Sequence, residues 1–98
     1  MIKTLTGVGA IISAAHRSRD GVMHGHTWEI IAWFEEGRCA VELQTELQNY
    51  LKMFDHSVLG DEIAWGEALC KAILQGMDCV DVEVRRPLER LYVKVDLR

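Results

Sequence analysis

The sequence lacks the features that mark secreted, membrane-spanning and multidomain proteins. A single proline and the absence of any low-complexity tract leave no linker, so we expect one domain over residues 1–98. No apolar run approaches the roughly 20 residues that cross a bilayer, and the start at Met1–Lys3 shows no signal peptide. The three cysteines, at positions 39, 70 and 79, are odd in number and have no CxxC spacing, which favours reduced thiols in a cytoplasmic protein.

Positive charge is also scarce. The chain has 11 Lys and Arg residues against 15 Asp and Glu residues, for a net charge of -4. Binding of nucleic acid requires a basic stripe that neutralises phosphates, so this balance argues against nucleic acid as the main partner. The apolar share of 49% is enough for a packed core, and we expect a folded domain.

The periodicity of the apolar residues predicts two strands, two helices and two further strands. The predicted strands cover Thr4–His16, His24–Glu35, Val80–Val84 and Leu91–Leu97, and the helices lie around Leu43–Leu51 and from about Ile63 to Gln75. Residues 17–23 and 86–90 are predicted as turns, Phe54–Gly60 as a loop, and Gly76 as the stop of the second helix. The order ββααββ predicts an α+β fold in which two helices pack on one face of an antiparallel sheet.

The second predicted strand has apolar residues on both of its faces. Its even positions continue from two histidines into Trp28, Ile30 and Phe34, while its odd positions include Ile31 and Trp33. If helices cover one face, the other needs a different cover. We therefore expect a homo-oligomer in which a neighbouring subunit packs against the odd face.

Three of the four histidines lie close together in the sequence. His24 and His26 project from the same face of a strand because side chains alternate, and His16 lies across a short turn from them. Zinc held by three protein ligands keeps a fourth position open for water or substrate, as in catalytic sites. The pattern is compatible with such a site; the alternative is a chance pair of hydrogen-bonded histidines.

A second candidate is the pair Asp55 and His56 in the predicted loop. A carboxylate next to an imidazole orients it and supports its charged form, which suits a proton relay. The alternative is that both side chains only cap or solvate the loop.

Taken in order, these motifs resemble the 6-pyruvoyl-tetrahydropterin synthase family, whose bacterial branch includes 6-carboxy-tetrahydropterin synthase of the queuosine pathway. The resemblance rests on Ile12–Arg17 (ISAAHR), His24–His26 (HGH) and Phe54–His56 (FDH), and all four histidines fall on family histidine positions. It covers most of the chain and includes the ββααββ order. It implies the tetrahydropterin-synthase fold (T-fold), assembled into an oligomeric barrel that is trimer-based or hexameric.

The same resemblance implies a zinc-dependent lyase that acts on a dihydroneopterin-type pterin, a small-molecule substrate. The charge balance and the lack of a long apolar run lead us to expect no nucleic acid or membrane partner. His16, His24 and His26 would hold Zn²⁺, which polarises hydroxyl groups of the substrate. Asp55 and His56 would tune proton transfer, and a glutamate would anchor the pterin ring.

The chain departs from the family pattern at two functional positions. Asp20 stands where the family has its catalytic cysteine, and can be a carboxylate base or only a turn residue. Arg85–Pro87 stands where the anchoring glutamate belongs, and Glu89 is then the nearest acidic candidate for substrate binding. These departures leave open an altered pterin substrate, an aldolase-like cleavage of a pterin side chain, a non-catalytic metal- or ligand-binding relative, and a small α+β domain without metal.

Overall fold

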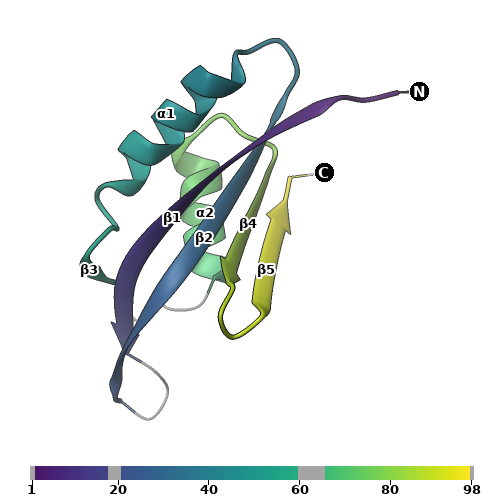
Figure 1. Ribbon diagram of the computed structural model, residues 1–98. Coiled ribbons are helices and arrows are strands. Elements are labelled where there is room, and N and C mark those ends of the chain that lie inside the picture. The colour runs from purple at the N-terminus through teal and green to yellow at the C-terminus, as the bar shows by residue number, and fades with distance from the viewer. Residues whose placement is uncertain (1, 18–20, 60–65, 98) are drawn as a thin grey trace.

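The computed structural model describes residues 2–17, 21–59 and 66–97, which form five strands and two helices in an α+β fold (Figure 1). In chain order the elements are β1 (Leu5–Arg17), β2 (Met23–Glu35), α1 (Ala40–Leu51), β3 (Ser57–Leu59), α2 (Glu67–Gly76), β4 (Asp81–Arg86) and β5 (Leu91–Asp96). The two helices lie together on one side of the open sheet (Figure 1). The predicted packing of both helices on one sheet face is therefore confirmed.

The sheet is built around a long hairpin of β1 and β2. Its strand order is β3-β1-β2-β4-β5, and all neighbours are antiparallel except β1 and β3. The hairpin pairs from Leu5 opposite Glu35 to Arg17 opposite Met23, whereas β4 pairs only with the segment 29–33 of β2. The turn end of the hairpin, which carries the three histidines, consequently extends past the β4–β5 hairpin (Figure 1).

The core lies between the helices and the even-numbered face of β1 and β2. From β2 the residues Trp28, Ile30, Ala32 and Phe34 are buried, as the alternation predicts. From α1 the residues Leu43, Leu47 and Leu51 are buried; their i, i+4, i+8 spacing places them on one side of the helix. From α2 the residues Leu69, Cys70 and Ile73 complete this layer. No helix in the described part of the chain is long and apolar enough to span a membrane.

The prediction of a loop over Phe54–Gly60 is wrong at its centre, where Ser57–Leu59 form β3. This strand lies parallel to β1, with Ser57 opposite Ala14 and Leu59 opposite His16. Three residues are too few for alternation to be recognised in the sequence, and the pairing partner is more than 40 residues away. The prediction of a helix from about Ile63 is confirmed from Glu67 to its end at Gly76, and residues 60–65 lie outside the described part.

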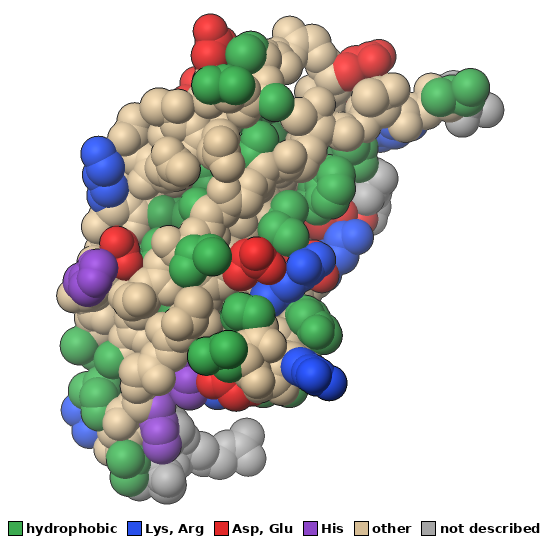
Figure 2. Space-filling model, viewed as in Figure 1, with side chains coloured by type: hydrophobic (Ala, Val, Ile, Leu, Met, Phe, Trp, Pro, Cys, Tyr) green, Lys and Arg blue, Asp and Glu red, His purple; other side chains and the backbone are tan. Residues whose placement is uncertain are grey.

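In the described part of the chain no helix covers the opposite face of the sheet (Figure 1), which presents both apolar and charged side chains (Figure 2). Ile11 is 64% exposed and Tyr92 58% exposed, while Ile31 and Trp33 are half-buried. Between them Arg85 forms ion pairs with Glu29 across the strands and with Glu83 on its own strand. That a neighbouring subunit covers this face stays a prediction.

Candidate functional site

The three histidines converge at the turn end of the β1–β2 hairpin. His16 lies directly opposite His24, and His26 lies opposite Ala14, so all three side chains project from the face that also carries Trp28. The ring centroids are 4.9 Å apart for His16 and His26, 6.1 Å for His24 and His26, and 6.2 Å for His16 and His24. His16 is buried, whereas His24 is exposed, so the cluster opens to solvent on one side.

The donor types fit a three-imidazole zinc site, but of the ring spacings only the 4.9 Å between His16 and His26 matches one. Three imidazoles bound tetrahedrally to one zinc through nitrogen at the usual bond length have their ring centroids about 5 Å apart. The described residues nevertheless include no His, Cys, Asp or Glu group whose donor atoms are already arranged to hold a metal. Zinc binding would therefore need the His24 ring to move closer to the other two.

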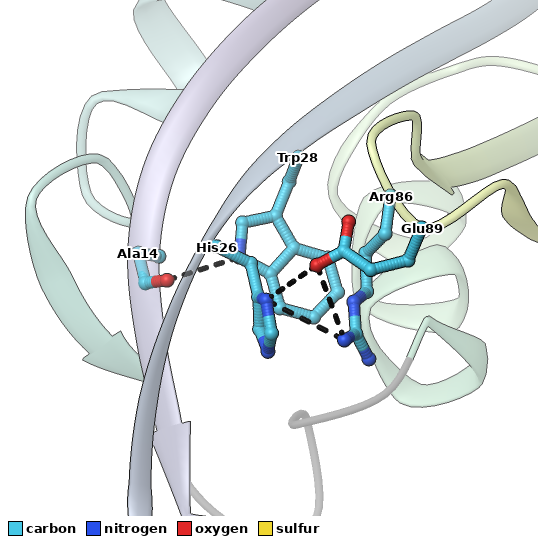
Figure 3. Close-up of polar contacts among 5 residues, drawn as sticks. All are labelled: Ala14, His26, Trp28, Arg86 and Glu89. Carbon is cyan, nitrogen blue, oxygen red and sulfur yellow. Dashed lines mark hydrogen bonds and ion pairs between the residues drawn. The ribbon is translucent and has the colours of Figure 1, made fainter.

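His26 is held by residues from the β4–β5 turn (Figure 3). Its Nδ1 lies 2.8 Å from Oε1 of Glu89, and the same oxygen lies 3.4 Å from Nη2 of Arg86. The Arg86 guanidinium stacks over the ring of Trp28, 5.6 Å from its centroid, and the indole Nε1–H of Trp28 donates to the Ala14 carbonyl at 3.1 Å. The sequence predicted no link between Glu89 and the histidines, although the alternation of β2 already placed Trp28 beside His26.

The charges in this group shift the pKa values of His26 and Glu89. The pKa of His26 lies below its usual value because burial disfavours the charged ring and the Arg86 guanidinium adds to this effect, which together outweigh the hydrogen bond with Glu89. Partial desolvation of Glu89 raises its pKa. Hydrogen bonds from its own backbone N–H and from the side chains of Arg86 and His26 lower the pKa by more, so the net pKa is below the usual value. A neutral imidazole beside an ionised carboxylate is the form that can ligate a metal.

Asp55 and His56 form the expected pair, and Asp55 also fixes the start of β3. Oδ2 of Asp55 lies 3.1 Å from Nδ1 of His56, while its Oδ1 accepts a hydrogen bond of 2.9 Å from the Ser13 backbone N–H. The Ser13 carbonyl in turn accepts from the His56 N–H. The hydrogen bond from Ser13 is the largest cause of the lowered pKa of Asp55, followed by the opposing effect of desolvation and the favourable effect of His56. The His56 side chain is 81% exposed and therefore accessible to a substrate.

One open pocket of about 580 Å³ joins these groups. His26, His56 and Glu89 all line it, so it contains one member of the metal cluster, one of the acid–base pair and the predicted substrate-binding carboxylate. Val58 and Leu88, both largely exposed, contribute apolar surface to its wall.

None of the three cysteines places a reactive thiol beside the histidine cluster. Cys70 and Cys79 are buried, and burial raises their pKa values to about 12 and about 11. Cys39 is exposed at the N-terminus of α1, beyond the end of β2 that is opposite to the histidines, and the strand between them is roughly 30–35 Å long. Asp20, the predicted base, lies outside the described residues.

Comparison with known proteins adds no assignment. The chain matches no model of a protein family, and a search of curated proteins also found no match. The function is therefore argued from the site.

Proposed function

We propose that the protein is a zinc-dependent tetrahydropterin-synthase-like lyase that acts on a dihydroneopterin-type pterin, in pterin or queuosine-precursor biosynthesis. The observation that carries the proposal is the cluster of His16, His24 and His26, whose rings gather on one sheet face beside a pocket. When bound there, zinc would polarise the hydroxyl groups of the substrate side chain.

The protein's own residues would supply binding and proton transfer. The apolar side chains of Val58 and Leu88 can cover the faces of a pterin ring, and the Glu89 carboxylate can accept hydrogen bonds from its edge. His56 is exposed on the same pocket and is oriented by Asp55, so it can give or take a proton at the substrate side chain. Asp20 is the candidate for the base that stands in for a thiolate.

Zinc binding and turnover test the proposal separately. Purified protein should bind about one equivalent of zinc per chain. It should also consume dihydroneopterin triphosphate, which chromatography of the pterins would measure. His24→Ala should lose zinc and turnover together. His56→Ala is the matched control, because it removes an imidazole outside the cluster and should keep zinc while losing turnover. Less than about a tenth of an equivalent of zinc in the folded wild type would reject the metal site.

The cysteines favour one alternative, a related enzyme with an altered pterin substrate or an aldolase-like cleavage of the side chain. The standard synthase reaction would have no thiolate base among the described residues, because Cys70 and Cys79 are buried with raised pKa values and Cys39 lies far from the cluster. Turnover of unphosphorylated pterins, but not of the triphosphate, would favour this alternative. Zinc binding without turnover of any pterin would favour a non-catalytic relative.

We also propose that the sheet is a T-fold that assembles into an oligomeric barrel, trimer-based or hexameric. The apolar side chains of Ile11, Ile31 and Trp33 on the face without helices support this assembly. Light scattering at micromolar concentration should give a mass of at least three chains, and a monomer would contradict the proposal.

A further inference from the structure

We propose that Glu89 is a positioning residue for His26: it accepts the hydrogen from Nδ1 and so keeps Nε2 available for a metal ion. This inference rests on the proposed zinc site and deepens it. It gives Glu89 a second role beside the proposed contact with the pterin edge: its carboxylate, from the β4–β5 turn, orients a histidine of β2.

The hydrogen-bond chemistry determines the tautomer. Two groups face Nδ1 of His26: Oε1 of Glu89 at 2.8 Å, which as an ionised carboxylate can only accept, and Nη2 of Arg86 at 3.4 Å, which can only donate. The shorter contact requires a hydrogen on Nδ1, and Arg86 can then donate to Oε1 of Glu89 instead. Oε1 lies within reach of two donors, His26 Nδ1–H and Arg86 Nη2–H. A neutral imidazole with its hydrogen on Nδ1 has its lone pair on Nε2, which is the form that binds zinc. A carboxylate that accepts from the second ring nitrogen is the usual outer partner of a metal-bound histidine.

The position of Glu89 is itself supported from the core. Arg86 ends β4, its side chain is only 13% exposed, and its guanidinium stacks on the fully buried Trp28. The Glu89 N–H donates to the Arg86 carbonyl at 3.1 Å, which closes the turn on the same side. Two contacts therefore tie Glu89 to Arg86: this backbone hydrogen bond and the side-chain contact drawn in Figure 3.

The tautomer of His26 can be read without metal, and this separates the inference from the proposed function. In metal-free wild type at neutral pH, long-range ¹H–¹⁵N correlation spectra should show His26 with its hydrogen on Nδ1. Glu89→Ala should return the ring to a mixture or to the Nε2–H tautomer, whereas Glu89→Gln, which keeps an acceptor oxygen, should retain the Nδ1–H form.

Zinc affinity, measured by competition with a chelator, is the second measurement. Glu89→Ala should weaken zinc binding by about 10- to 100-fold. Glu89→Gln should lose some zinc affinity because the negative charge is removed, but less than Glu89→Ala because the acceptor oxygen remains. Glu36→Ala is the matched control: it removes an exposed glutamate just after the far end of β2 and should change neither measurement.

Two results would overturn the inference. One is a His26 that keeps its hydrogen on Nδ1 in Glu89→Ala. The other is a Glu89→Ala variant that raises KM for a pterin while the tautomer and the zinc affinity stay at wild-type values, because that is the behaviour of a residue that only binds substrate. If the wild type binds no zinc, the proposed function fails, and the metal-free spectra still decide whether Glu89 orients His26.

Discussion

Replacing Trp28 by phenylalanine tests whether the buried indole, which packs against His16 and His26, stabilises the fold and the histidine cluster. The side chain is fully buried, and its Nε1–H donates to the Ala14 carbonyl at 3.1 Å. Its ring packs edge to face with the rings of His16 and His26, with 5.6 Å between ring centroids in each pair. Phenylalanine leaves about 40 Å³ empty, which costs about 1 kcal/mol. The lost hydrogen bond costs about 1 kcal/mol more. We expect the free energy of unfolding to fall by about 2 kcal/mol.

The measurement is urea unfolding followed by far-UV circular dichroism, with a chelator present so that bound metal does not add to the stability of the folded state. For a domain of this size the expected loss lowers the midpoint by about 1–2 M urea. Tyr50→Phe is the control, because it removes a hydrogen bond of 3.1 Å to the Ala72 carbonyl and leaves the ring in place. It should cost about 1 kcal/mol or less.

A Trp28→Phe variant within about 0.5 kcal/mol of the wild type would refute the reasoning, since neither the cavity nor the hydrogen bond would then contribute as the structure indicates. The same variant should also bind zinc more weakly, because His16 and His26 both lose a ring contact. Unchanged stability with weakened zinc binding would mean that the indole acts on the rings alone.

Three further predictions concern other parts of the fold. A thiol reagent at pH 8 should label one cysteine quickly, and Cys39→Ser should abolish that phase, because burial raises the pKa of Cys70 to about 12. Gly76→Ala should destabilise the protein by about 1–3 kcal/mol, measured by urea unfolding, because a Cβ at this position would lie 2.6 Å from Cε2 of Tyr50. The lowered pKa of Asp55 stabilises the fold above the pKa of the unfolded chain, and this contribution is lost as the pH falls through the folded value; Asp55→Asn should therefore flatten the acid limb of stability against pH.

The alternation of β2 was sufficient to predict its core face and the common face of its histidines. Side chains at even positions of a strand must share a face, and the short turn after β1 then brings His16 opposite His24. Local periodicity and a tight connection thus carry most of the information about the β1–β2 hairpin and its cluster.

The contacts that local patterns could not predict are those between distant segments. His26 and Glu89 are separated by 63 residues, and only the packing of β4 against β2 brings the turn of one hairpin to the end of the other. The pairing of β3 with β1 is of the same kind. In both cases a charged or polar residue in a predicted loop has its role set by a strand elsewhere in the chain.

These long-range contacts decide what the cluster can do. Three imidazoles on a strand end are only a set of weak bases, each free to place its hydrogen on either nitrogen. His16 is restricted by burial and His26 by Glu89, while His24 remains exposed at the open side of the cluster. Of these three histidines, His26 is the one that lines the pocket, so a ligand there would meet the imidazole whose orientation is set by Glu89.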